Sequence, residues 1–122
     1  MTISVVRLGS PRAKDEGPRL GTVRRPPRGV KKQDYAKRDY YDVWLPELAP
    51  SASLIKTAHR DWKTFAKRYR QEMRAQTRLL DVFAALSRGA DFSVGCYCED
   101  ERRCHRSVLR GLLEQAGARL EK

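Results

Sequence analysis

The 122-residue sequence contains no long hydrophobic run. A membrane-spanning helix needs about 18 or more consecutive apolar residues, and no stretch of this chain approaches that length. The first residues also lack the basic start and the apolar core of a secretory signal peptide. We therefore expect a cytoplasmic protein that has no membrane partner.

Cysteine is scarce, with only Cys96, Cys98 and Cys104 in the chain. An odd and closely spaced set in a cytoplasmic protein argues against a framework of disulfides. Thiol or metal chemistry is the remaining interpretation of these three residues.

Acidic residues are also few, because 15 Asp and Glu stand against 26 Lys and Arg, which gives a net charge of +11. The net charge is +6 over residues 1–42, +4 over 43–95 and +1 over 96–122. Such a positive field favours anionic partners, and we expect an anionic ligand such as a nucleotide or nucleic acid. The cysteines lie in the nearly neutral last third, so the candidate chemistry and the strongest basic field come from different segments.

The length fits a single domain. Short β-branched or apolar runs predict strands near residues 3–8, 20–23, 42–45 and 91–98, and apolar periodicity predicts helices over 54–74, 77–88 and 104–116. Strands interleaved with helices indicate a small single-domain α/β layer fold with a mainly parallel sheet flanked by helices. We take residues 1–122 as this domain, with a basic loop rich in Pro and Gly at about 9–40.

The predicted helix over 54–74 carries a stripe of six basic side chains opposite its apolar face, and Ser51 or Ser53 can cap its start. The stripe is either a solvated surface or a ridge that contacts phosphates. A break near Arg60 and Asp61 would split the stripe into two unrelated patches. Its members are Lys56, Arg60, Lys63, Lys67, Arg70 and Arg74, and the apolar face includes Leu54, Ala58, Trp62, Phe65 and Tyr69.

Residues 96–106 form the densest chemical cluster, with three thiols, one imidazole, three carboxylates and three guanidiniums. The cluster joins the last predicted strand to the last helix, where ligands bind in open α/β sheets. Three interpretations compete for it: a metal site, a phosphatase-like loop, and a site for an anion or polar substrate at the start of the helix.

Zinc would suit the ligand types of Cys96, Cys98, Cys104 and His105. The tight Cys-x-Cys spacing counts against it, as does our expectation that the neighbours Cys104 and His105 point in different directions. Cys96 and Arg102 satisfy the Cys-x5-Arg spacing of a phosphatase loop, but the acidic residues between them would repel phosphate. No metal ligand is assigned, and the cofactor is unknown.

In the third interpretation the helix N-terminus and nearby arginines lower the pKa of Cys104. His105 lies on the helix face that we expect to point back at the sheet, and Cys96 is more typical of a core residue. The candidate catalytic residues are Cys98, Cys104 and His105, and the candidate substrate-binding residues are Arg106, Glu99, Arg25 and Arg28.

The motif Cys98-Glu99…Cys104-His105-Arg106 resembles the signature of the YeaO-like domain-of-unknown-function family, and Leu48–Ser51 matches its Leu-Ala-Pro-Ser element. Residues 24–30 resemble that family's Arg-x-x-Pro-Arg-Gly element, with Pro26 where its members often carry tryptophan. The resemblance implies an α/β fold and one site built from the basic loop and the cysteine loop. It implies no reaction.

Our leading hypothesis is an enzyme-like pocket for an anionic substrate, such as a nucleotide or nucleic-acid end. Arg25 and Arg28 attract the anion and Arg106 holds it, while Cys104 or Cys98 with His105 supplies nucleophile and base. The alternatives are a non-catalytic, basic nucleic-acid-binding module and a zinc-stapled structural domain. The sequence does not decide whether the protein is an enzyme, and it leaves the oligomeric state unknown.

Overall fold

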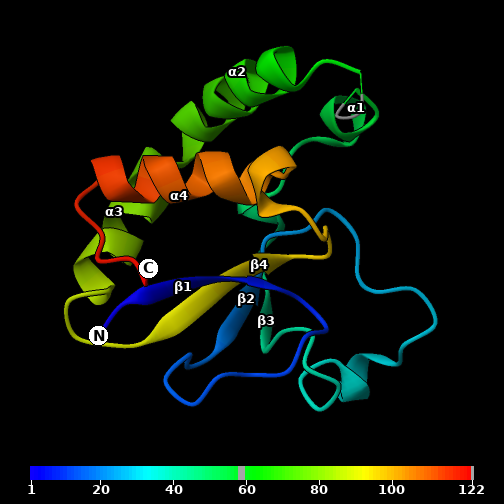
Figure 1. The fold of residues 1–122 in the computed structure, drawn as a ribbon, viewed down its shortest axis with the longest axis vertical. Helices are drawn as coiled ribbons and strands as arrows, with labels where there is room; N and C mark the ends of the chain where they lie inside the picture. The colour runs from blue at the N-terminus through cyan, green and yellow to red at the C-terminus, as the bar shows by residue number, and fades with distance from the viewer. Residues whose placement is uncertain (58–59, 122) are drawn as a thin grey trace.

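A computed structural model describes residues 1–57 and 60–121 (Figure 1). The strands β1 (Ile3–Arg7), β2 (Arg19–Gly21), β3 (Val43–Trp44) and β4 (Phe92–Cys96) pair in parallel in the order β1-β4-β2-β3. This sheet and its helices confirm the predicted α/β fold. All five residues of the central strand β4 are buried, as its unbroken apolar pattern predicted.

The helices gather on one face of the sheet. Side chains of α2 (Trp62–Met73), α3 (Thr77–Leu86) and α4 (His105–Gln115) form the main core together with Phe92 and Val94 of β4. Residues alternate between the faces of a strand, so Ser93 and Gly95 face the other way, where Ser93 Oγ donates to Glu16 O at 2.8 Å. The segment before β2 that contains Glu16 therefore lies over the face that the helices leave open.

The predicted continuous helix over 54–74 is wrong, because the chain forms α1 (Ala52–Ile55) and then α2. Asp61 caps α2 by accepting hydrogen bonds from the backbone and the hydroxyl of Thr64. A cap residue takes an extended backbone, which ends helical geometry before it. The basic stripe is consequently split, and only its members from Lys63 onward follow α2; Ala58, assigned to the apolar face, lies outside the described residues.

The other helices agree with the sequence pattern. Ser51 caps α1, as expected, by accepting from Leu54 N at 3.2 Å. The helices predicted over 77–88 and 104–116 correspond to α3 and α4. Short 3-10 helices complete the fold at Lys32–Asp34 (η1), Pro46–Leu48 (η2), Arg74–Gln76 (η3) and Glu101–Arg103 (η4). No helix within residues 1–57 and 60–121 has the length and apolar character to cross a membrane.

Candidate functional site

The predicted cysteine cluster forms where β4 ends and α4 begins. Cys96 is the last residue of β4, and Cys104 immediately precedes the first turn of α4. The ligand-type atoms of Cys96, Cys104 and His105 all lie within 4.8 Å of one another, and the three residues are buried. Cys98 is exposed, with its Sγ 3.7 Å from Sγ of Cys96. The site thus has two buried thiols and one thiol at the surface.

Cys104 and His105 point toward each other, although they are neighbours in sequence. Sγ of Cys104 lies 3.7 Å from Nδ1 of His105. Our expectation that they point apart is wrong, because Cys104 is the N-cap residue, with an extended backbone (φ −127°, ψ 151°), rather than a residue inside the helix. The expectation that the His105 ring faces the sheet is confirmed, because it is buried and contacts Thr22 of the segment after β2.

A hydrogen-bond count places a proton on Nε2 of His105. Thr22 Oγ1 lies 2.9 Å from the carbonyl oxygen of Gly95 and 3.1 Å from Nε2 of His105. The hydroxyl has one hydrogen, which it donates to the carbonyl, so it accepts from the protonated Nε2. Nδ1 is then the ring nitrogen that faces Cys104. This is the arrangement of a thiol, a base and a residue that orients the base.

The three thiols are electrostatically unequal. Hydrogen bonds from Cys96 and Cys98, together with His105, lower the pKa of Cys104 in spite of its burial. The hydrogen bond to Cys104 raises the pKa of Cys98, and the bonds to Cys104 and Cys98, with burial, raise the pKa of Cys96. Of the three thiols, Cys104 is therefore the one whose surroundings favour the thiolate form.

Arg106 is buried and contacts both ends of the loop that runs from Cys98 to Cys104. Its side chain is 3% exposed, and its Nε lies 3.5 Å from Sγ of Cys104 while its terminal nitrogen donates to the carbonyl of Cys98 at 2.5 Å. The guanidinium places positive charge next to the Cys104 sulfur, which favours its thiolate form. It also holds Cys98 and Cys104 together.

The other predicted binding residues lie nearer the surface. Arg25 is exposed, and its carbonyl accepts a hydrogen bond at 3.0 Å from the hydroxyl of Tyr97, next to Cys98. This contact brings the basic loop to the cysteine loop. Glu99 is exposed and forms an ion pair with Arg7 at 3.5 Å. Arg28 is exposed, and no contact among the described residues brings its side chain to the thiols.

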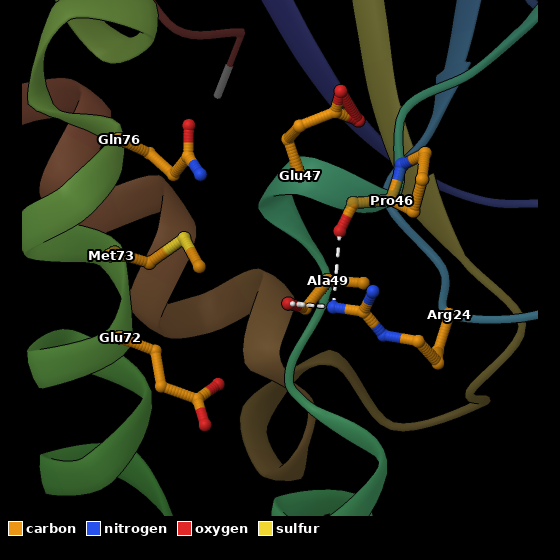
Figure 2. A pocket seen from close by; sticks show the side chains of 7 residues that line it. All are labelled: Arg24, Pro46, Glu47, Ala49, Glu72, Met73 and Gln76. Carbon is orange, nitrogen blue, oxygen red and sulfur yellow. Dashed lines mark hydrogen bonds between the residues drawn. The ribbon is translucent and has the colours of Figure 1, made fainter.

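A separate pocket of about 360 Å³ lies between η2 and the end of α2 (Figure 2). Arg24 lies at one side of it and donates to the carbonyls of Pro46 and Ala49, and also to that of Pro50. The first-half arginine element and the Leu-Ala-Pro-Ser element are therefore in contact. The described residues that line this pocket include none of the predicted site residues; they are Arg24, Pro46, Glu47, Ala49, Glu72, Met73 and Gln76.

Sequence reasoning missed two residues that hold His105 in place. Thr22 is a single polar residue in a predicted strand, and nothing in the pattern distinguishes it. Tyr69 lies on the apolar face of α2. Its ring packs edge-to-face with that of His105, with the two ring centroids 5.3 Å apart, and its hydroxyl donates to Leu48 O at 2.7 Å. A tyrosine in an apolar stripe is the one available signal, because its hydroxyl needs a partner when buried.

A family model described as the active DUF488-N3 subclade matches residues 3–117 of the chain. The match supports the resemblance inferred from the sequence at the level of the wider DUF488 family, to which YeaO also belongs. No curated protein and no solved structure matches the chain.

Proposed function

Because the chain belongs to the active DUF488-N3 subclade, we propose that it is a cysteine-dependent enzyme for an anionic substrate, a nucleotide or nucleic-acid end. The observation that carries the proposal is the chain of contacts from Cys104 through His105 to Thr22, with the exposed Cys98 held beside it by Arg106. Within the DUF488 family we place the protein near the YeaO-like members, on the motifs at 48–51 and 98–106.

Cys98 is the nucleophile in this proposal, because it is the thiol that a substrate can reach without rearrangement. Its sulfur bonds to the electrophilic centre while its proton passes through Cys104 to His105. His105, whose Nδ1 faces Cys104, holds that proton and returns it to the leaving group. Removing the base should therefore slow the attack of Cys98, although Cys98 itself is unchanged.

Positive charge around Cys98 would select an anionic substrate. Arg25 is held beside Tyr97 and, with Arg28, attracts the anion. Arg106 adds its charge from beneath the loop. Glu99, adjacent to Cys98, would accept a hydrogen bond from a hydroxyl or amino group of the same substrate.

Alkylation with a neutral and an anionic reagent tests both parts of the proposal. The folded protein is treated with iodoacetamide or iodoacetate, and tryptic peptides report the rate at each cysteine. We expect Cys98 to react faster than Cys96 and Cys104, and His105→Asn to slow it by about tenfold or more, since general base catalysis contributes at least this much. Replacing Arg25 and Arg28 by alanine should slow iodoacetate several-fold and leave iodoacetamide unchanged.

The control is Arg78→Ala, which removes an exposed positive charge on α3 and should leave both rates unchanged. Slow and equal alkylation of all three cysteines in the folded protein would refute the covalent mechanism. A stoichiometric zinc ion retained by protein purified without chelator would refute it as well, because Cys96, Cys104 and His105 have donor atoms that zinc prefers.

A specific observation also favours the nucleic-acid-binding alternative. Lys63, Lys67, Arg70 and Arg74 are all exposed, and in the described part of the chain none of them forms an ion pair with a carboxylate. These unpaired charges along α2 and its end would contact the phosphates of a nucleic acid.

A further inference from the structure

The structure removes both objections that the sequence raises against a metal site at the cysteine loop. The tight Cys-x-Cys spacing still brings Sγ of Cys96 and Sγ of Cys98 to 3.7 Å from each other. Cys104 and His105 point toward each other, with Sγ and Nδ1 also 3.7 Å apart. The donor atoms of Cys96, Cys104 and His105 all lie within 4.8 Å of one another. Three sulfurs and one imidazole nitrogen therefore gather where β4 ends and α4 begins.

The separations agree with those of a tetrahedral zinc site. Zinc binds thiolate sulfur at about 2.3 Å and imidazole nitrogen at about 2.0–2.1 Å. Tetrahedral geometry then sets two sulfurs about 3.8 Å apart, and a sulfur and a nitrogen about 3.6 Å apart. The distance of 3.7 Å in the Cys96–Cys98 pair and in the Cys104–His105 pair fits both values, so a metal ion could bind with little rearrangement of these pairs.

His105 is oriented as metal-ligating histidines usually are. Its Nε2 donates to Thr22 Oγ1 at 3.1 Å, so Nδ1, which faces Cys104, is the ring nitrogen left to bind a metal. The donor residues Cys96, Cys104 and His105 are 7%, 2% and 4% exposed. The interior ligands are thus largely shielded from water and one of them is fixed by a second hydrogen bond.

We propose that Cys96, Cys98, Cys104 and His105 bind one zinc ion exchangeably and that this ion inhibits the protein, an inhibition that rests on the proposed function for the role of Cys98. Each cysteine ligates as a thiolate and releases its proton to water. Zinc bound to Cys98 and to Nδ1 of His105 occupies the nucleophile and the base together, so the substrate is not attacked.

Two features favour an exchangeable ion over a permanent one. Cys98 is exposed, so the fourth ligand lies at the surface and gives the ion a path in and out. Nε of Arg106 lies 3.5 Å from Sγ of Cys104, and an N–H donor on a ligating sulfur withdraws electron density that the sulfur would otherwise share with the metal. The site should therefore hold zinc less firmly than a closed structural site does.

Titration with cobalt and zinc tests the site directly. The reduced protein is first freed of metal by dialysis against a chelator. Co²⁺, which zinc ligands also bind and which is coloured, is then added. We expect one Co²⁺ per chain, with the visible bands of a tetrahedral ion and a near-ultraviolet charge-transfer band from thiolate. Zn²⁺ should displace the cobalt and remove these bands, and competition with a chromogenic chelator gives the zinc affinity.

Variants of the ligands and of their neighbours identify the site. Thr22→Val should weaken zinc binding by about 10–100-fold, the usual effect of losing a partner that orients a ligand, and Thr22→Ser should restore it. Cys98→Ser removes a ligand at the surface and should weaken zinc binding and the charge-transfer band. Asp100→Asn is the control, because it removes an exposed carboxylate from the same loop, and it should leave the zinc affinity unchanged.

Alkylation measures the inhibition. Saturating Zn²⁺ should abolish the reaction of Cys98 with iodoacetamide, and an excess of chelator should restore it. Alkylation of Cys98 at an unchanged rate in the zinc-saturated protein would overturn the proposed inhibition.

An octahedral Co²⁺ spectrum without the thiolate band would overturn the metal site, as would a zinc affinity that falls in Asp100→Asn and not in Cys98→Ser. Zinc that stays bound through purification without chelator would overturn the exchange, and the proposed enzyme with it. Rapid alkylation of Cys98 in a protein that binds no Co²⁺ refutes only the metal site. Tetrahedral cobalt binding in a protein whose metal-free thiols alkylate slowly and equally refutes only the proposed enzyme.

Discussion

Thr22 Oγ1 lies 3.1 Å from Nε2 of His105, on the side of the imidazole opposite Cys104. The same hydroxyl is bound to Gly95 O at 2.9 Å. It is therefore anchored to the central strand and fixes both the orientation and the tautomer of the ring. Thr22 is a positioning residue for His105, and its effect should reach Cys98 only through His105 and Cys104.

Replacing Thr22 by valine should impair both reactivity and stability. Valine keeps the shape but leaves Nε2 of His105 without its partner, so we expect a loss of about 1–3 kcal/mol in the free energy of unfolding. We also expect slower alkylation of Cys98 and a shifted pH profile of that rate, because the tautomer is no longer fixed. Urea unfolding and iodoacetamide kinetics between pH 6 and pH 9 measure the two effects. Thr22→Ser should restore both, and a destabilised Thr22→Val with an unchanged profile would reduce Thr22 to a packing role.

The sequence was sufficient for the order of elements but not for this contact. Apolar runs predicted all four strands, and the density of thiols predicted where the site lies. Thr22 follows β2, whereas His105 opens α4, so their contact depends on the strand order, which places β2 beside β4. Local pattern carries no information about which strands become neighbours.

Two errors have local physical causes. The helix over 54–74 looked continuous because its apolar spacing persists, but the cap at Asp61 ends that regularity. Cys104 and His105 looked divergent because both were counted as helical, whereas Cys104 is an extended cap residue. At Asp61 a side-chain cap, worth about 1 kcal/mol, decided the geometry against the periodic pattern. Cys104 makes no side-chain cap hydrogen bond, and its extended backbone alone sets the start of α4.

The buried pair of Arg19 and Glu16 should make stability depend on pH. Their side chains are 0% and 4% exposed, and the Arg19 guanidinium also donates to Ser10 O and Asp39 O. Burial raises the pKa of Glu16, but hydrogen bonds from Arg19 and Ala13 N outweigh it and lower the pKa overall. A carboxyl with a lowered folded pKa stabilises the fold above its unfolded pKa of about 4.3 and loses this contribution as the pH falls through the folded pKa.

We therefore expect Glu16→Gln to lose about 3–5 kcal/mol at pH 7, as for other broken buried pairs. The difference from the unmodified protein should shrink as the pH falls below about 4, where Glu16 itself becomes protonated. Urea unfolding at pH 7, 5 and 3.5 measures it, with Asp15→Asn at an exposed neighbouring position as the control. If the stability difference between Glu16→Gln and the unmodified protein stayed constant down to pH 3.5, it would contradict a lowered pKa of Glu16 in the folded protein.

Two glycines should respond in opposite ways to alanine. A Cβ at Gly21 would lie 2.3 Å from Cδ2 of Tyr41, whose ring packs over β2, so we expect Gly21→Ala to cost about 1–3 kcal/mol through overpacking. A Cβ at Gly111 on α4 would meet nothing within 4 Å, so Gly111→Ala should gain about 0.5–1 kcal/mol from helix propensity. Thermal unfolding of both variants gives the comparison, and a Gly21→Ala protein as stable as the original would show that Tyr41 can move aside.

The exposed basic residues of α2 should govern any binding to nucleic acid. Each phosphate bound by a basic side chain contributes about −0.9 to the slope of log affinity against log salt for a duplex. Replacing Lys63 and Lys67 by alanine should therefore weaken binding to a duplex of about 20 base pairs and make that slope shallower by about 0.9 for each phosphate that the variant no longer binds. Fluorescence anisotropy over a series of salt concentrations measures both quantities.

Lys14→Ala removes an exposed charge from the loop on the opposite face of the sheet and should leave the slope unchanged. If binding instead depends on Arg25 and Arg28, the nucleic acid contacts the cysteine site, and the stripe on α2 is only a solvated surface.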